Sequence, residues 1–207
     1  MIVSSRLGAE AVSGSDETSA QAPLAPLETE LVSGCRRGRL ASFEWLYQLH
    51  GSRMKSIALN LLGNRSDAED AVQDAFIKIF RNISEFRGES RLATWIYRIL
   101  VNTCYDSRRR RSRVQEVTAD SVIPLEDFCE ASATHHSTPL RYALESAILK
   151  LEPRQRSIFV LYEVEGFTHS EIGRILEIPE GTSKHGLYQA KRHLQRLLGR
   201  GRNRRNP

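Results

Sequence analysis

The chain has 207 residues, 40% of them hydrophobic, and its 30 Lys and Arg against 25 Asp and Glu give a formal net charge of +5. This hydrophobic content excludes a largely disordered chain, and three cysteines exclude a disulfide-held scaffold and suit a reducing compartment. No secretory signal is visible, and no apolar run reaches the roughly 18 residues that a membrane span needs. We therefore expect a cytoplasmic protein without direct membrane insertion.

Charge is distributed along the chain in blocks. Residues 67–77 hold four acids and no base, residues 78–113 hold ten bases and three acids, and residues 181–207 hold eight bases and no acid. A solvated helix face or a basic tail would explain one such block. Two basic blocks on helices with apolar opposite faces favour a nucleic acid as partner.

Helical periodicity dominates the first half of the chain. Residues 1–27 are rich in Ser, Ala, Gly and Pro and are predicted to be a disordered tail. Apolar residues then recur at steps of three and four from Leu40, and Gly63-Asn64 ends this run. The next predicted helix has its N-cap at Ser66, with Glu69 in the capping-box position. No strand-like alternation appears, so the fold is predicted to be all-α.

A third predicted helix runs from Leu92 to the arginine cluster 108–111, and it has two different faces. One face is apolar, and the other presents Trp95, Arg98, Asn102, Tyr105 and Arg109. Aromatic and arginine side chains in this arrangement can stack on unpaired bases and bind their edges, although Trp95 alone would equally suit a core position. The preceding loop, residues 87–90, is small and polar enough to pocket an extruded base.

The remainder of the chain predicts a second helical domain. Residues 112–139 are acidic and weakly periodic, which is typical of a flexible linker, and residues 199–207 form a basic tail. The linker would join a helical bundle over 28–111 to a second domain over 140–198.

The second domain carries a helix-turn-helix pattern. Thr168 and Glu171 have the spacing of a capping box, Glu177–Pro179 break the chain, and a helix with a basic exterior follows from about Gly181. Early residues of such a helix reach base edges in the major groove, whereas later cations bind phosphates. The alternative is an ordinary helical hairpin with a basic outer face.

Several segments resemble the bacterial sigma factor family. Those similar to conserved region 2 are Asp67–Phe80, Phe86–Ser90 and Thr94–Asn102. Those similar to region 4 are Leu151–Arg156, Phe167–Leu176 and Ile178–Thr182. The presence of these two regions alone, joined by a short acidic linker, resembles the extracytoplasmic-function (ECF) class.

The resemblance implies partners and site residues. It implies a region 2 bundle and a region 4 helix-turn-helix that act with core RNA polymerase, promoter DNA and an anti-sigma factor. The residues implied to dock on the polymerase core are Asp67, Asp70, Gln73 and Asp74. Those implied for the minus-ten element are Arg87, Gly88, Glu89, Ser90, Trp95, Arg98, Asn102 and Arg109. Those implied for the minus-thirty-five element are Thr182, Ser183, Lys184, His185, Tyr188, Gln189 and Arg192.

Two positions depart from the family pattern. Gly186 and Gln189 stand where the family usually has basic residues, and Gly186 either allows close approach to a phosphate or is simply tolerated.

Cys129, His135 and His136 do not supply four zinc ligands at a usual spacing. We therefore expect no metal, cofactor, small-molecule substrate or enzymatic site.

Two alternatives to a sigma factor remain open at this point. The chain would act as an autonomous helix-turn-helix regulator if it formed a dimer on a palindromic site. It would act as a protein-interaction module if it only sequestered polymerase or a regulator.

Overall fold

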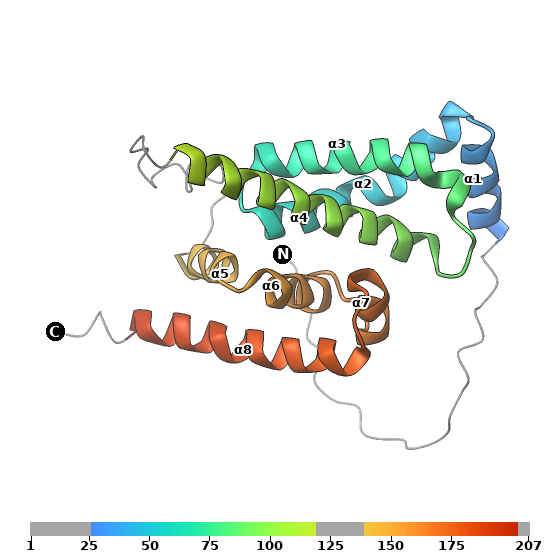
Figure 1. Cartoon of the computed structure of the whole chain (residues 1–207). Helices are drawn as coiled ribbons and strands as arrows, with labels where there is room; N and C mark the ends of the chain where they lie inside the picture. Colours follow the sequence, from blue (N-terminus) through green and yellow to red (C-terminus); the bar gives the residue numbers. More distant parts are fainter. Residues whose placement is uncertain (1–25, 119–138, 203–207) are drawn as a thin grey trace, which may run out of the picture.

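The computed structural model describes residues 26–118 and 139–202, and these residues contain helices and no strand. The elements are α1 (Pro26–Arg36), α2 (Leu40–Leu62), α3 (Arg65–Asn82), η1 (Ile83–Glu85), α4 (Leu92–Thr118), α5 (Pro139–Leu149), α6 (Pro153–Phe159), η4 (Val160–Val164), α7 (His169–Leu176) and α8 (Glu180–Arg202). Helices α1–α4 form one bundle and α5–α8 a second (Figure 1). The all-α prediction with two helical units is confirmed.

Some predicted features lie outside the described residues. These are most of the N-terminal tail, residues 119–138 of the linker, Cys129, His135 and His136, and residues 203–207 of the basic tail. At the edges of these segments, α1 begins within the predicted tail, and α4 continues past the arginine cluster to Thr118.

The first bundle is held by apolar faces and by a compact turn between α2 and α3. Gly63 ends α2 with φ 85°, a left-handed conformation that glycine adopts without steric cost. Asn64 then caps α3, because its side-chain oxygen accepts from the Asp67 backbone N–H at 2.7 Å. The prediction that Ser66 is the N-cap was wrong, since the helix starts as soon as the left-handed turn is complete.

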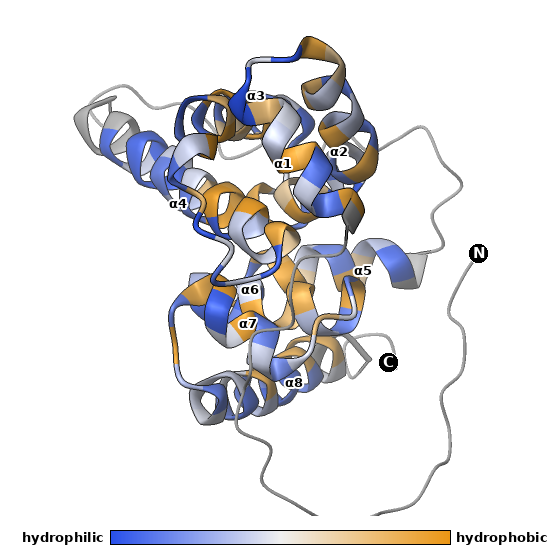
Figure 2. Ribbon diagram, turned by 90° about the vertical axis from the view of Figure 1, so that its right-hand side faces the viewer, coloured by the Kyte–Doolittle hydropathy of each residue, from blue (hydrophilic) through white to orange (hydrophobic). Residues whose placement is uncertain are grey.

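The second bundle contains the predicted helix-turn-helix. Thr168 and Glu171 form the capping box at the start of α7, as predicted. Glu177 ends α7 in the left-handed region with φ 55°, and α8 begins three residues later. Figure 2 shows hydrophobic positions turned inward in both bundles and also where the two bundles meet.

A buried arginine connects the two bundles. Arg156 of α6 is 3% exposed, and its guanidinium donates to the carbonyl oxygens of Ile148, Leu149 and Leu151 in its own bundle. It also donates to the carbonyl of Leu61 at the end of α2, at 2.7 Å. Burial lowers the pKa of Arg156 to about 10, so the group is still a cation at neutral pH.

We predict that Arg156→Met lowers the unfolding free energy by about 3 kcal/mol, because several buried carbonyls lose their donor. Urea denaturation followed by circular dichroism measures this change. Arg154→Met, two residues away on the exposed side of α6, is the matched control and should change stability by less than about 0.5 kcal/mol. Equal effects in the two variants would contradict the role of Arg156.

A histidine between α2 and α4 of the first bundle adds a pH dependence to the stability of the chain. The Nδ1 atom of His50 lies 3.1 Å from the Tyr97 hydroxyl. Burial, and then the charge of Arg53, lower the pKa of His50 below its usual value of about 6.5. Proton binding therefore favours the unfolded chain, and this contribution to stability is present above pH 6.5 and is lost as the pH falls below it.

We predict that the urea concentration at the unfolding midpoint decreases when the pH is lowered from 7.5 to 5.5. We predict a smaller decrease for His50→Gln. Part of the dependence should survive in this variant, because burial also lowers the pKa of His169. An identical pH profile in wild type and His50→Gln would show that His50 does not contribute.

Candidate polymerase and nucleic-acid interfaces

The predicted docking residues lie along one side of α3, and the structure divides them into two pairs. Asp70 and Gln73 are exposed. Asp74 pairs with Arg110 of α4 at 3.4 Å, and Asp67 pairs with Arg111. Ion pairs this exposed contribute little to stability, so a basic partner surface can displace them at small cost. Asp67 also has a structural role in the first turn of α3, which sequence analysis did not identify.

The predicted minus-ten face of α4 is only partly assembled as expected. Asn102 and Arg109 are exposed, and Arg98 keeps 38% of its side chain accessible. Trp95 is half-buried and packs on Phe86, with ring centroids 5.4 Å apart. Tyr105 points to the second bundle instead, where its hydroxyl lies 2.7 Å from the Ser157 hydroxyl. The tryptophan therefore stays on this face, whereas the hydroxyl of Tyr105 is engaged by the second bundle.

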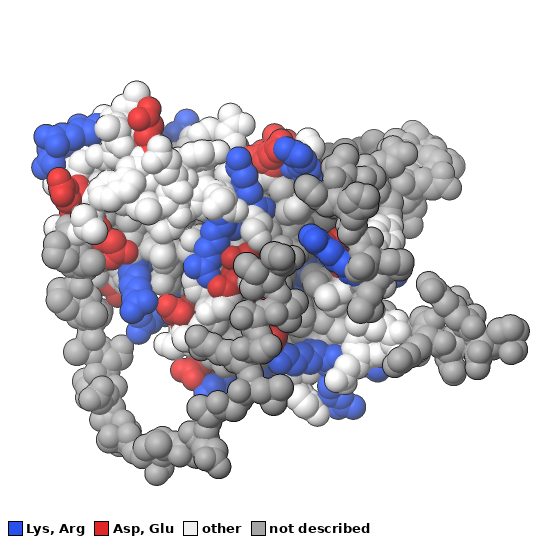
Figure 3. Space-filling model, turned by 180° about the vertical axis from the view of Figure 1, so that it is seen from behind, with Lys and Arg blue, Asp and Glu red and all other residues white. Residues whose placement is uncertain are grey.

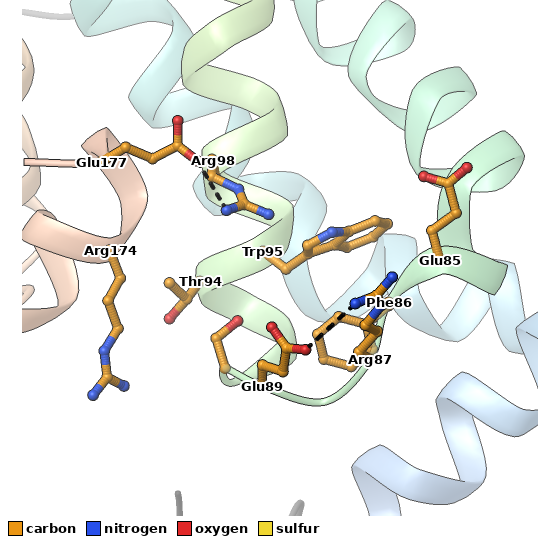
Figure 4. Close-up of a pocket in the computed structure, with 10 residues that line it drawn as sticks. Glu85, Phe86, Arg87, Glu89, Thr94, Trp95, Arg98, Arg174 and Glu177 are labelled. Carbon is orange, nitrogen blue, oxygen red and sulfur yellow. Dashed lines mark hydrogen bonds and ion pairs between the residues drawn. The ribbon is translucent and has the colours of Figure 1, made fainter. Parts of the chain in front are cut away.

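The loop before α4 forms one wall of a polar cavity of about 480 Å³. Arg87, Glu89 and Ser90 line it from the loop, and Thr94, Trp95 and Arg98 line it from α4. Gly88 has φ 75° and lets the loop turn sharply at this point. The volume lies within the range of ordinary ligand pockets. Figure 4 shows that Arg174 and Glu177 of the second bundle close the opposite side.

The exposed face of α8 presents most of the predicted minus-thirty-five residues. Thr182, Lys184, His185, Tyr188, Gln189 and Arg192 are all exposed. Figure 3 shows Lys and Arg side chains gathered along the lower edge of the molecule, where α8 runs. Ser183 differs, because it is fully buried and its hydroxyl lies 2.9 Å from His169 Nδ1. Its placement corrects the prediction, since Ser183 joins α7 to α8 and does not face solvent.

The structure also explains the two departures in α8. Gly186 is buried, and a Cβ atom built on it would lie 2.5 Å from Cδ1 of Ile158 in α6. This glycine therefore allows close packing of two helices and not approach to a phosphate. Gln189 is held by two side chains, since its Oε1 accepts from Gln155 at 3.1 Å and its Nε2 lies 2.7 Å from His185 Nε2.

These features define a helical nucleic-acid-binding protein in which a helix-turn-helix is joined to an arginine- and tryptophan-bearing face. Residues 46–114 match the family model for sigma-70 region 2, and residues 141–194 match that for sigma-70 region 4. The two matches together span more than half of the chain. The chain belongs to the sigma-70 family and, by its relatives, to the ECF class.

Curated relatives and a solved structure support this assignment. The chain is 29% identical to the ECF RNA polymerase sigma factor SigM of Mycobacterium tuberculosis, over 83% of this chain and 85% of the relative. It is 28% identical to the ECF RNA polymerase sigma factor SigW of Bacillus subtilis, over 81% and 94%. It superposes with a TM-score of 0.65 and 26% identity on the sigma factor RpoE of Bartonella quintana, solved with the anti-sigma factor NepR, over 77% and 98%.

Within the described ranges 26–118 and 139–202, none of the helices combines the length and apolar character needed to cross a membrane. The sigma-70 family is not an enzyme class.

Two glycines of the helix-turn-helix allow a test of its geometry. A Cβ atom on Gly173 of α7 would lie 2.8 Å from the backbone oxygen of Ile178, whereas one on Gly181 of α8 would meet nothing within 4 Å. We predict that Gly173→Ala lowers the unfolding free energy by about 1–3 kcal/mol, because backbone must move. Gly181→Ala should leave stability unchanged or raise it by up to about 1 kcal/mol. Thermal unfolding of both variants checks this, and equal melting temperatures would contradict the tight turn.

Proposed function

We propose that this chain is a promoter-specificity subunit that binds core RNA polymerase and directs it to particular promoters. The observation that carries this proposal is the order of three surfaces in one chain, namely the acidic side of α3, the polar face of α4 and the basic face of α8. An acidic patch within a basic protein suits a protein partner better than DNA. The family matches on both halves of the chain favour this function over that of an autonomous regulator.

The first bundle would act on the minus-ten element. Unstacking a base step costs a few kcal/mol, so a protein that opens DNA by binding alone must recover that energy from stacking and base capture. Trp95, Arg98 and Asn102 supply an aromatic surface and hydrogen-bond donors on α4. The cavity between the loop before α4 and that helix supplies a place for an extruded base.

The second bundle would bind the upstream element as a duplex. Lys184, His185, Tyr188 and Gln189 lie on the exposed face of the first turns of α8, where a recognition helix contacts base edges. Arg192 lies one turn further and suits a phosphate. Thr182 lies at the start of α8 and also suits a contact with the phosphate backbone of the DNA.

An anti-sigma factor completes the proposed set of partners. The superposed structure of RpoE contains such a factor, and the two chains share their fold over most of their length. As a polymerase subunit the chain would act in the cytoplasm, where polymerase and chromosomal DNA lie.

We predict that Asp70→Lys weakens binding to a bacterial core RNA polymerase at least about tenfold, because a charge is reversed on the proposed docking side. Size-exclusion co-elution and a fluorescence titration of labelled protein measure the loss. Glu69→Lys makes the same charge change at the adjacent position of the same helix, outside the docking set, and is the matched control.

The outcomes of this test separate three interpretations. Loss in Asp70→Lys alone supports the docking side. Equal binding by both variants and wild type would place the docking surface elsewhere. No binding by wild type would contradict the proposal and favour an autonomous regulator, whose oligomeric state would then be measured.

A further inference from the structure

Two helices of the second bundle approach each other closely at one point. Helix α6 packs against α8 (Figure 1), and a Cβ atom on Gly186 of α8 would collide with Ile158 of α6. Gln155 lies three residues before Ile158, and Gln189 lies three residues after Gly186. Residues three apart share one face of a helix, so the close approach at the glycine continues one turn further to the two glutamines.

The two glutamines and a histidine form a chain of hydrogen bonds at this point. Gln155 Nε2 donates to Gln189 Oε1 at 3.1 Å, and Gln189 Nε2 lies 2.7 Å from His185 Nε2. An amide nitrogen can only donate, so the ring nitrogen accepts and His185 carries its proton on Nδ1. Both polar ends of the Gln189 amide therefore have a partner, and one of these partners belongs to another helix.

Gln155 is itself held in place by its surroundings. Its backbone N–H donates to the side chain of Glu152, the N-cap of α6, at 3.0 Å. The next residue, Arg156, is buried and hydrogen-bonded to carbonyls of both bundles. The side chain of Gln155 is half-buried. The donor that reaches Gln189 thus comes from a firmly supported part of the fold, which is what precise positioning of a binding residue requires.

We infer that Gln155 is a positioning residue that sets base specificity at the upstream-element interface, although it lies in α6. This inference rests on the proposed function. A glutamine reads adenine when its Oε1 accepts from the amino group of the base and its Nε2 donates to N7. In the hydrogen-bond chain both of these atoms of Gln189 are already engaged. Gln155 therefore withholds Gln189 from adenine, and the preference at this position is set from a helix other than α8.

The inference gives the effect a direction and a size. Gln155→Leu removes the donor and keeps a side chain of similar volume. Releasing one hydrogen bond worth about 1 kcal/mol net corresponds to about a fivefold change in an equilibrium constant. We expect the variant to favour adenine, on one strand or the other, about fivefold more than wild type does at one position of the upstream element and nowhere else.

A transcription assay measures this preference. The full chain is combined with bacterial core RNA polymerase and a pool of barcoded templates whose upstream and minus-ten segments are randomised, and transcripts are counted by sequencing. Gln155→Leu is compared with wild type and with Gln155→Leu/Gln189→Ala, in which the gain of adenine should disappear. Gln195→Leu is the matched control, because it makes the same substitution at an exposed position further along α8. This control should keep the wild-type profile.

A second measurement tests the contact in the free chain, without polymerase or DNA. Two-dimensional ¹⁵N–¹H NMR resolves the side-chain amides of the glutamines, and Gln189→Ala assigns the amide of Gln189. We expect Gln155→Leu to shift the Gln189 amide resonances and Gln195→Leu to leave them unchanged. If the Gln189 amide does not shift in Gln155→Leu, Gln155 does not position Gln189 and the inference is wrong.

Three transcription results also overturn the inference. A Gln155→Leu profile equal to that of wild type would show that Gln155 does not set base specificity. An equal loss of transcription on all upstream sequences would show that Gln155 contacts the DNA backbone instead. A gain of adenine that survives in the double variant would exclude Gln189 as the residue that reads it.

Failure of the proposed function gives a different result. In that case wild type directs polymerase to no promoter in the pool, so neither the variants nor the control has a profile to compare. A specificity role for Gln155 then fails together with the proposed function, while the NMR result still decides whether Gln155 holds the Gln189 amide.

Discussion

The junction of the two bundles depends on one buried cation, the guanidinium of Arg156. Its donors satisfy the carbonyls where α5 ends and α6 begins, and one donor crosses to the end of α2. A helix end that is buried without partners is costly, so a side chain with several rigid donors suits this place better than lysine would. This cation acts together with other contacts between the bundles, which include the Arg53–Glu165 ion pair and the hydrogen bond between Tyr105 and Ser157.

Some charged side chains that form ion pairs within the chain also lie where contacts with other molecules are proposed. Arg98 is positioned for a nucleic acid by α4, yet its present partner is Glu177. Asp74 is positioned for a protein partner by α3, yet its present partner is Arg110. In both places an exposed ion pair within the chain stands where an intermolecular contact is proposed, and exposed pairs are exchanged at low cost. A chain built in this way remains a compact molecule alone and still offers the same side chains to its partners.

Sequence periodicity predicted the helices well because each buries one apolar face, and the capping box at Thr168 was predicted because its signal is local. Local signals failed where two caps competed, since Asn64 and Ser66 both suit an N-cap and only the backbone turn at Gly63 decides between them. Local signals also failed for Ser183 and Tyr105, because the helical spacing of each matches that of residues that are exposed. Their partners His169 and Ser157 are 14 and 52 residues away in the chain, and spacing within one helix carries no information about them.

The departures in α8 bear on how this chain would choose its promoters. The close approach of α6 explains Gly186, and because this residue is buried against α6, it removes no side chain from the exposed face of α8. Gln189 can bind adenine through both ends of its amide, but Gln155 and His185 now engage both ends. Reading a base with Gln189 must therefore break two hydrogen bonds, each worth about 1 kcal/mol net. The preference at this position would then depend on residues of α6 as well as α8.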